Sequence, residues 1–577
     1  MLTNNVSLTI IHITVLLYMK RVILITVLFL APIISFALTP NDIYHGPNNI
    51  FYINPSLHEV KLRLKHKGKA RIFVHLDTLQ LEMSSVFREE PYEYYATTMP
   101  AVDIGVSYYF TVTTEQESLR IPQTGTFIPA APEFTTPVWS QGKVYYSIFP
   151  DGFFNGNPNN DPERTRSWGA TPVQWDPYGG DIIGIRNKMS YIDSLGVDII
   201  LLQPVFSAES NHKLNPRDFA SIDPHLGDTT EFKRLIDEIH RRNMKIVYSV
   251  PFSHTGTEFP TFQDIENNQG DSKYLDWYKI KSTPIRTSPP SYECWRDDHR
   301  FPKLNLGNAQ VVNYLLGYLE YWKHFEIDGF YLGEDSIFDP TFIQTLRNHL
   351  KTRYPDILLI GSDKRLVSGS GFDGCSNKKL PELLTAYFID QTMTSSEFDR
   401  AVRRLLFFNP PQVNNVNLIP LSDYNKRRYT INPALQRNLF AFMLTWVGSP
   451  VILFGDEIGM TASSPLNCGS FPWDASQQDR SMLEEIKKLI KIRKDHPTFS
   501  STTYYSLYAN DMNKIYAYDR GGIIVILNNS DKESYIELPA WSGVYNDVIT
   551  GEKMTAYNQV LRLTIGPQTY QILRREF

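Results

Sequence analysis

The sequence predicts an α/β protein in which a (β/α)8 barrel is flanked on both sides by regions of short β-strands. Between residues 138 and 499, apolar strand-like runs alternate with amphipathic helical stretches, which is typical of a parallel barrel. In residues 38–132, short runs alternate between apolar and polar side chains, which indicates the half-buried strands of a small β-sandwich. Residues 500–577 return to short strands. A length of 577 residues also exceeds one hydrophobic core and favours several domains.

The central barrel is predicted from strand–helix units that repeat along the chain. After the first strand, the stretch 180–196 places apolar side chains on one face of a helix. Asp228 is predicted to cap the next helix, with Glu231 as its capping-box partner. The predicted barrel strands are 144–151, 197–202, 245–250, 327–332, 357–361, 417–421 and 451–454.

Charge and cysteine content exclude several classes of function. The formal net charge is -5 and the chain has no long basic run, so we expect no nucleic-acid partner. The cysteines Cys294, Cys375 and Cys468 lie far apart and form no Cys-x-x-Cys pair. This spacing argues against a zinc site and against a disulfide framework, although it leaves one bridge open.

Residues 1–37 have the features of a secretion signal. Lys20 and Arg21 precede the apolar run 22–34, and the small-residue sequence Ser35-Phe36-Ala37 follows it as a cleavage site. We therefore expect export to the periplasm or the extracellular space, with no stable membrane span after cleavage. The alternative is an uncleaved anchor, but the apolar core is shorter than the roughly 20 residues of a span.

Several longer motifs, in a fixed order, resemble one family. They are Asn211-His212-Lys213, Ile222-Asp223-Pro224-His225, Phe301-Pro302-Lys303-Leu304-Asn305, Phe325 to Asp335 and Phe454-Gly455-Asp456-Glu457-Ile458-Gly459-Met460. Together they resemble the α-amylase clan of glycoside hydrolases, family 13, and within it the neopullulanase and cyclomaltodextrinase subgroup. This resemblance implies a domain B inserted at residues 256–302 and a C-terminal β-sandwich at 500–577.

The start of the N-terminal region adds to the resemblance. Tyr44-His45-Gly46-Pro47 and Val106-Ser107-Tyr108-Tyr109-Phe110 are similar to the N-terminal sandwich of the same subgroup, where this module helps dimerisation. The resemblance therefore implies a homodimer. A packing domain without its own ligand is the alternative interpretation of this region.

The resemblance also identifies the catalytic positions, and this chain departs from the family at both. Gly333 stands at the position of the nucleophilic Asp, and Ser362 stands at the position of the general-acid Glu. Tyr331 replaces the Arg that keeps the nucleophile ionised. Retaining glycosidases need two carboxyl groups about 5 to 5.5 Å apart. A serine hydroxyl is too weakly acidic to protonate a glycosidic oxygen near neutral pH.

Positions that support catalysis are changed as well. Ser249, Ser253, Leu214 and Ser422 replace the family's Asp, Asn, Tyr and His. The resemblance implies that four residues line the substrate site: His212, His254, Asp423, which retains the transition-state stabiliser, and Tyr331.

Two hypotheses of function follow. The first is a secreted pseudoenzyme that binds a maltodextrin-like α-glucan or a protein partner through the inherited surface. The second is an active α-glucan hydrolase that uses the displaced carboxylates Asp335, Asp363 and Asp423. Alternation along a strand turns Asp363 away from the barrel lumen, and Asp335 is displaced by two residues, at about 3.3 Å each, from the nucleophile position. These facts favour the first hypothesis.

One loop resembles the calcium site of the subgroup. Its six positions combine side-chain and backbone oxygens, which suit calcium, and are Asn155, Asn157, Asn160, Asp161, Gly179 and Asp181. The family commonly has Asp where this chain has Asn157, which lowers the negative charge of the site. The alternative is an Asn-Pro-rich turn that satisfies its own hydrogen bonds.

Overall fold

The computed structural model describes residues 38–45, 59–65, 69–76, 78–98, 107–128, 135–333, 338–367, 371–421, 432–461, 463–464 and 467–576. The chain divides into two compact units, Met1–Ala131 and Pro132–Phe577. The predicted leader, residues 1–37, lies outside the described residues. In the part that is described, none of the helices combines the length and hydropathy that crossing a membrane requires.

The N-terminal unit is an antiparallel sheet around its own core. In the order β1-β2-β5-β4-β3-β6-β7, its strands are β1 (Ile43–Tyr44), β2 (Glu59–Lys65), β5 (Tyr92–Thr98), β4 (Leu79–Glu89), β3 (Ala70–Leu76), β6 (Tyr108–Thr114) and β7 (Ser118–Ile121). The alternating apolar residues of β2 and β3 are buried, as the pattern predicts. His45 lies in this core with both ring nitrogens bonded, Nδ1 to Lys61 O at 2.7 Å and Nε2 to Tyr108 Oη at 2.8 Å.

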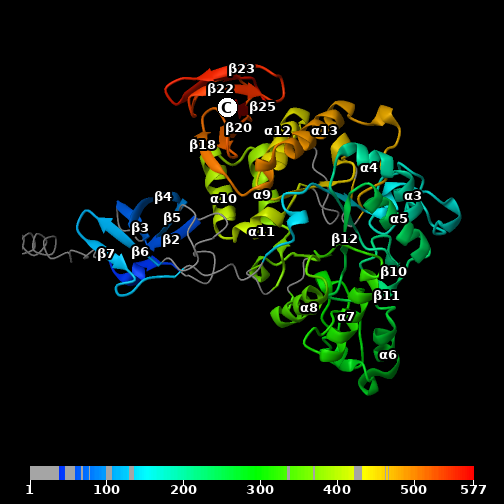
Figure 1. The fold of residues 1–577 in the computed structure, drawn as a ribbon. Coiled ribbons are helices and arrows are strands. Elements are labelled where there is room, and N and C mark those ends of the chain that lie inside the picture. The colour runs from blue at the N-terminus through cyan, green and yellow to red at the C-terminus, as the bar shows by residue number, and fades with distance from the viewer. Residues whose placement is uncertain are drawn as a thin grey trace, which may run out of the picture. The chain divides into compact units, whose positions relative to one another are not determined.

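The second unit contains the predicted barrel (Figure 1). Its parallel strands are β8 (Tyr145–Ile148), β9 (Ile199–Leu202), β12 (Lys245–Ser249), β13 (Gly329–Leu332), β14 (Leu358–Gly361), β15 (Gly374–Cys375), β16 (Leu418–Pro420) and β17 (Ser449–Leu453). They pair in the order β15-β14-β13-β12-β9-β8-β17-β16. A parallel bridge between Ser376 and Leu418 joins the two edge strands. The predicted fold class is therefore confirmed.

Alternation along the strands separates an inner from an outer face. Side chains from alternate positions of the strands point inward and form one cluster. Its members are Tyr145, Ile199, Leu201, Val247, Leu358, Ile360, Leu418 and Val451, and Tyr331 packs against them. The intervening residues, such as Tyr146, Ile200 and Phe330, belong to the core that the helices cover. Because the lumen is filled by side chains, a ligand has access only at the strand ends, and in such barrels the C-terminal ends carry the site.

The helices that cover the barrel agree with the sequence prediction except at residues 180–196. They are α3 (Ile182–Asn187), α4 (Met189–Leu195), α5 (Thr229–Arg241), α7 (Ala309–Lys323), α8 (Pro340–Arg353), α9 (Lys379–Leu384), α10 (Ser395–Phe407), α11 (Pro411–Val416), α12 (Pro433–Thr445) and α13 (Arg480–Asp495). The predicted helix 180–196 is two helices that meet at Lys188. Asp228 caps α5 through Glu231 N–H at 2.9 Å. Strand β15 was not predicted, because two residues carry no periodic pattern.

An insertion follows β12. It consists of α6 (Pro260–Asn268), short 3-10 turns and isolated antiparallel bridges, and one of these, His254 to Lys303, joins its two ends. The chain enters the insertion just after β12 and leaves it just before α7. The insertion therefore lies where it can add side chains to the C-terminal end of the barrel.

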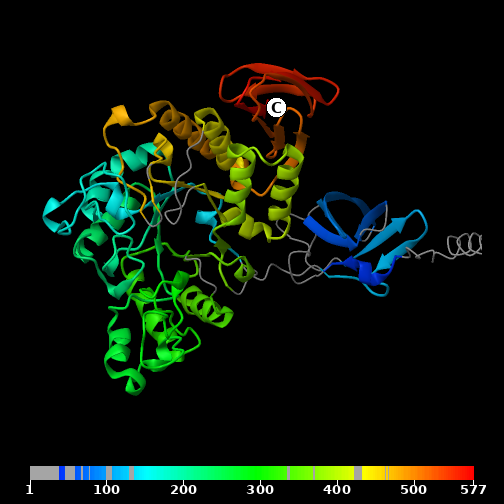
Figure 2. The same cartoon turned by 180° about the vertical axis from the view of Figure 1, so that it is seen from behind.

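The C-terminal strands form two antiparallel sheets, β18-β19-β20-β25-β22-β23 and β21-β24. They are β18 (Tyr505–Asn510), β19 (Ile515–Asp519), β20 (Ile523–Asn528), β21 (Ser534–Pro539), β22 (Gly543–Asp547), β23 (Lys553–Ala556), β24 (Val560–Ile565) and β25 (Thr569–Arg575). Figures 1 and 2 both show them next to α10 and α12. The fully buried Arg520 donates to the carbonyl oxygens of Thr445, at the end of α12, and Thr503. Such charge-assisted bonds fix the sheets to the barrel.

The three cysteines are buried and form no disulfide with one another. The bridge that the sequence left open is therefore absent between Cys294, Cys375 and Cys468.

Candidate functional site

The C-terminal mouth of the barrel collects the candidate site residues that the structure describes. Each stands at or just after the end of a different strand: Ser249 ends β12, Gly333 follows β13 and Ser362 follows β14. Ser249 pairs in register with Tyr331, and Tyr331 pairs with Ile360. These three neighbouring strands therefore bring the predicted positions together at one edge of the mouth.

Tyr331 occupies the space in which a side chain at position 333 would lie. A Cβ built on Gly333 would fall 1.7 Å from Tyr331 Cζ and 2.2 Å from Tyr331 Oη. Real Cβ atoms do not approach other atoms this closely, so any larger residue at 333 requires the Tyr331 ring to move. Gly333 and the present position of the Tyr331 ring are therefore sterically linked.

The general-acid position holds a hydroxyl, and the carboxylate beside it is already bound. Ser362 is buried, whereas Asp363 forms a two-pronged ion pair with the exposed Arg365, with Oδ2 2.5 Å from Nη2 and Oδ1 2.9 Å from Nε. The hydrogen bond from Arg365 lowers the pKa of Asp363. A carboxylate with a lowered pKa holds no proton near neutral pH and cannot act as the acid.

His254, which follows strand β12, forms its hydrogen bonds with other groups of the protein. His254 is fully buried; its Nε2 lies 2.8 Å from the carbonyl oxygen of Leu214, and its Nδ1 lies 2.8 Å from Ser253 Oγ. Its ring stacks on Trp295 at 4.8 Å between centroids. The structure thus gives His254 a packing role in addition to the substrate contact that the resemblance implies.

On the β8 and β9 side, buried polar atoms lack partners among the described residues. They are Gln203 Oε1, Asn211 Oδ1 and His212 Nε2. Nδ1 of His212 accepts from Leu214 N–H at 3.2 Å, so Nε2 carries the proton of the neutral ring. Burial, and then the nearby Lys213, lower the pKa of His212 well below 6.5. Buried polar groups are rarely left unbonded, so these atoms mark a place for water or a ligand.

Aromatic side chains surround His212. The Trp175 ring meets His212 edge-on at 4.7 Å, and Phe301 stacks on it at 6.1 Å. The guanidinium of Arg300 lies 3.9 Å from the centre of the Trp175 ring. Aromatic faces next to hydrogen-bonding groups can hold the apolar face and the hydroxyls of a sugar at once.

Three of the sequence-predicted residues cannot be placed. Asp335, Ser422 and Asp423 lie outside the described residues. Their roles, including that of Asp423 as the retained stabiliser, stay predictions.

The loop predicted to hold calcium has an incomplete hydrogen-bond network. Asp161 accepts from Asn155 Nδ2 at 2.8 and 3.0 Å, and Asp181 caps α3 through Gly184 N–H at 2.5 Å. Within the described residues, the buried side-chain oxygens of Asn155 and Asn160 have no partner. The φ of Gly179 is 82°, and a Cβ there would lie 2.5 Å from Asp161 Oδ1. Unpaired oxygen donors beside a carboxylate fit a calcium ion.

Sequence reasoning missed two members of this site, Trp175 and Gln203. Gln203 directly follows strand β9, so its place at a strand end was a usable signal. Trp175 lies in a loop of turns between α2 (Pro150–Phe153) and α3, where no local pattern predicts its approach to His212.

Comparisons with known proteins agree with the geometry. A family model described as alpha amylase, catalytic domain, matches residues 147–337. A cyclomaltodextrinase of Thermoanaerobacter pseudethanolicus is 32% identical over 84% of this chain and 89% of its own length. Neopullulanase 2 of Thermoactinomyces vulgaris is 30% identical over the same shares, 84% and 89%. A solved cyclomaltodextrinase structure superposes with a TM-score of 0.83 at 24% identity, covering 92% of this chain and 100% of that chain.

Proposed function

Because the chain belongs to the α-amylase family, in the group of the cyclomaltodextrinases and neopullulanases, we propose that it binds an α-glucan at the barrel mouth without hydrolysing it. The observation that carries this proposal is the Tyr331 ring, which fills the space of a side chain at Gly333. Double displacement at the anomeric carbon requires a nucleophilic carboxylate there and a proton donor opposite. Gly333 and Ser362 supply neither.

Binding is supported by the opposite side of the mouth. The proton on His212 Nε2 and the oxygens of Asn211 and Gln203 are buried and unbonded among the described residues, so sugar hydroxyls can complete their hydrogen bonds. Trp175 and Phe301 provide apolar faces beside them. Neutral donors and acceptors suit an uncharged glucan.

A second candidate is an active hydrolase with displaced carboxylates. It needs Asp363 or Asp335 as the acid or nucleophile, with Asp423 as the stabiliser. The ion pair of Asp363 with Arg365 and its lowered pKa weigh against Asp363 as the acid. The first candidate is therefore preferred.

Incubation of the purified chain with maltodextrin, pullulan and cyclodextrin tests the proposal. We expect no release of reducing sugar above the protein-free blank. Hydrolysis that disappears in Asp335→Asn or Asp363→Asn would replace the proposal with the active-hydrolase candidate. Hydrolysis that persists in both variants and stays with the protein through a second purification column would also overturn the proposal.

We also propose that the loop with Asn155, Asn160 and Asp161 binds calcium. The ion would be held by the side-chain oxygens of Asn155 and Asn160, which have no partner among the described residues, together with the Asp161 carboxylate. It would stabilise the fold by mass action, by about 2.7 kcal/mol at a hundred times the dissociation constant. Addition of calcium to chelator-treated protein should raise the melting temperature by a few degrees. Asp161→Asn should remove this shift, whereas an equal shift in the variant would contradict the site.

We further propose that the chain is exported after cleavage of residues 1–37 and that it forms a homodimer. The apolar run 22–34 behind Lys20 and Arg21 supports cleavage after Ala37, and mass spectrometry of the chain from its native host would identify a new N-terminus at Leu38. By resemblance, the N-terminal sheet supports a homodimer. A monomeric mass in solution at micromolar concentration would contradict this part. A protein partner in place of a glycan is the alternative if no α-glucan binds.

A further inference from the structure

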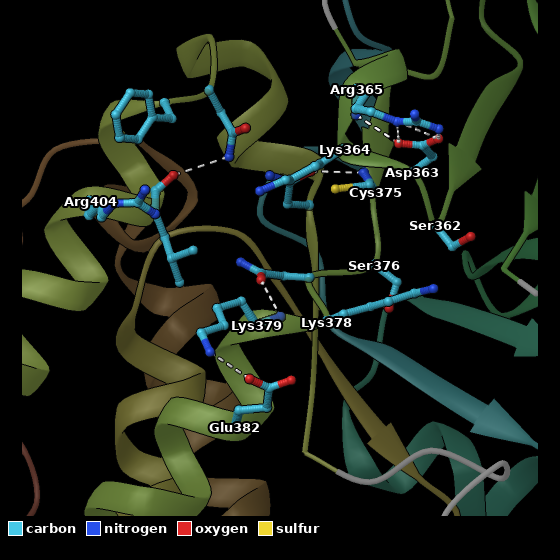
Figure 3. A pocket seen from close by; sticks show the side chains of 15 residues that line it. Ser362, Asp363, Lys364, Arg365, Cys375, Ser376, Lys378, Lys379, Glu382 and Arg404 are labelled. Carbon is cyan, nitrogen blue, oxygen red and sulfur yellow. Dashed lines mark hydrogen bonds and ion pairs between the residues drawn. The ribbon is translucent and has the colours of Figure 1, made fainter. Parts of the chain in front are cut away.

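Asp151 is a buried carboxylate on the side of the barrel mouth that carries His212. It follows strand β8 in the short helix α2, and only 4% of its surface is exposed. Lys213, the cation that acts on its pKa, is paired with Asp223 instead. Asp363, on the β14 side of the mouth, is different because its charge is matched by Arg365 (Figure 3). A carboxylate that is buried without such a match is costly to the fold, so we looked for what it provides.

Within the described residues, the hydrogen bonds to the Asp151 carboxylate come from uncharged N–H groups. Its Oδ1 accepts from Tyr178 N–H at 2.8 Å and from Gly179 N–H at 3.0 Å. Its Oδ2 accepts from Asn211 Nδ2 at 3.3 Å. Tyr178 and Gly179 belong to the loop between α2 and α3 that also carries Trp175. Asp151 therefore connects this loop with Asn211, and both contribute to the proposed glucan site.

The charge of Asp151 is not needed for the loop. Burial raises the pKa of Asp151 to about 6, although the N–H bonds from Tyr178 and Gly179 lower it. An asparagine in its place would serve both backbone N–H groups through its one oxygen and would avoid the buried charge. What only the carboxylate provides is a second oxygen, and that oxygen accepts from Asn211.

Two acceptors fix the orientation of the Asn211 amide. Its Nδ2 lies 3.3 Å from Asp151 Oδ2 and 3.3 Å from the carbonyl oxygen of Asp176. The opposite orientation would place the amide oxygen against both of these oxygens, so the hydrogen-bond network decides between the two. Oδ1 of Asn211 is left buried and without a partner among the described residues. It is an acceptor, next along the chain to the donor Nε2 of His212.

The carbonyl group of Asp176 is itself held in place by Asn467. The fully buried Asn467 donates from Nδ2 to the carbonyl oxygens of Val173 at 2.7 Å and Asp176 at 3.2 Å. Its own Oδ1 accepts from Gly469 N–H at 2.9 Å, which fixes this amide as well. Both acceptors around Asn211 Nδ2 are thus set by the protein, as a preorganised binding group requires.

From these contacts we infer that Asp151 is a positioning residue of the glucan site, which turns the Asn211 amide so that Oδ1 accepts a hydrogen bond from a sugar hydroxyl. Asp151 does not touch the sugar and acts through Asn211. The inference rests on the proposed function, because the ligand is the α-glucan. It adds a rule of specificity: one hydroxyl of the sugar must donate, and a group that cannot donate is rejected at that position.

Calorimetric titration of maltoheptaose into Asp151→Asn tests the role of the second oxygen. The variant keeps an oxygen for the loop but places an NH2 group against Asn211 Nδ2, so the Asn211 amide has to turn its own NH2 toward the sugar. We expect binding to weaken about tenfold relative to the unchanged chain. The matched control is Asp547→Asn, at a buried carboxylate of β22 that accepts from Ile549 N–H and Thr550 Oγ1. No weakening in the first variant, or equal weakening in both, would overturn the inference.

A double-mutant cycle shows whether Asp151 acts through Asn211. Asn211→Ala should weaken maltoheptaose binding about tenfold, and Asp151→Asn added to it should weaken binding by less than about twofold more. Two effects that multiply to about a hundredfold would mean that Asp151 supports the site by another route. The assignment of Asp151 as the residue that positions Asn211 would then be wrong.

Maltose derivatives with fluorine in place of one hydroxyl at a time test the orientation of the amide, because fluorine cannot donate. In the unchanged chain, fluorine at one position or more should weaken binding at least about tenfold relative to maltose. At one of these positions the penalty should fall below about twofold in both Asp151→Asn and Asn211→Ala. Asn211→Ala alone keeps the panel decisive if Asp151→Asn does not fold.

The outcomes separate this inference from the proposed function. No fluorine penalty at any position, or penalties that all persist in the variants, would overturn the inference and leave glucan binding standing. Failure of the unchanged chain to bind maltose and maltoheptaose would overturn the proposed function, and the inference with it.

Discussion

At the mouth of the barrel, the side formed by β8 and β9 carries buried polar atoms that have no partner among the described residues, next to aromatic rings. The side formed by β13 and β14 carries a glycine, a serine and a tyrosine ring. On the first side, Asn211 Oδ1 and His212 Nε2 are two such atoms in the part of the chain that the structure describes. On the second, the Tyr331 ring fills the space at Gly333. Polar atoms and rings that could hold a sugar lie on the first side, whereas positions 333 and 362 on the second side carry no carboxyl group. Under the proposed function, sugar binding and cleavage of the glycosidic bond would depend on different strands.

The largest effect on hydrolysis should come from placing the family's catalytic residues back on the side of the mouth formed by β13 and β14. Gly333→Asp alone should remain inactive, because its Cβ collides with the Tyr331 ring and no arginine keeps the new carboxylate ionised. Gly333→Asp and Ser362→Glu together should give little activity. With Tyr331→Arg, Ser249→Asp and Ser422→His added, reducing-sugar assays should detect α-glucan hydrolysis at least roughly a hundredfold above the blank.

The matched control for this series keeps Tyr331 and contains the other four changes. Little activity is expected from it, because residues that act as a unit are not additive. Robust hydrolysis by Gly333→Asp alone would mean that a competent acid is already present. The interpretation of Ser362 as an empty acid position would then be wrong.

A second prediction concerns His45, which is a buried histidine with both nitrogens bonded and thus the counterpart of His212. Burial lowers the pKa of His45 to about 4, from 6.5 in the unfolded chain. Between these pH values only the unfolded chain binds the proton, so stability is complete above pH 6.5 and falls as the pH drops toward 4. The loss amounts to about 3 kcal/mol. Hydrogen exchange of β2 and β6 at pH 7 and pH 4.5 measures it.

A variant checks the origin of this pH dependence. His45→Phe should make the opening free energy of the N-terminal sheet, obtained from exchange rates relative to the intrinsic rate at each pH, nearly independent of pH over this range, with the loss of the two hydrogen bonds. A slope that persists in the variant would assign the effect to another group.

The smallest expected effect is a change in glucan affinity caused by a substitution at His212, on the side of the mouth formed by β8 and β9. His212→Phe keeps an aromatic ring against Trp175 and removes the free Nε2 proton. We expect the affinity for maltoheptaose to fall about tenfold, which corresponds to the loss of one hydrogen bond of about 1.4 kcal/mol. His45→Phe is the same chemical change at a bonded histidine and should leave the affinity unchanged. If the two variants bind equally well, His212 is not part of the glucan site.

The fold was predictable because its signals are local. The alternation in β2 and β3 and the cap of α5 by Asp228 each depend on residues that are close in the sequence. The two-residue strand β15 was missed for the same reason, since Gly374 and Cys375 have no pattern to read.

The sequence predicted which strand ends carry the residues of the candidate site, but it did not predict how their side chains pack. The sequence located Gly333 and Ser362 at strand ends, but the packing of the Tyr331 ring over Gly333 depends on a side-chain rotamer that no local pattern specifies. The unbonded Nε2 of His212 likewise depends on neighbours that are distant in the sequence.

Calorimetric titration of maltoheptaose into the purified chain, followed by mass spectrometry of the recovered sugar, tests most directly whether the chain binds a glucan without hydrolysing it. We expect saturable binding heat and a recovered sugar that is entirely intact after prolonged incubation. Shorter glucans in the recovered sample, formed by the unchanged chain and not by Asp335→Asn, would contradict it and would show that hydrolysis survives without the carboxylates at positions 333 and 362.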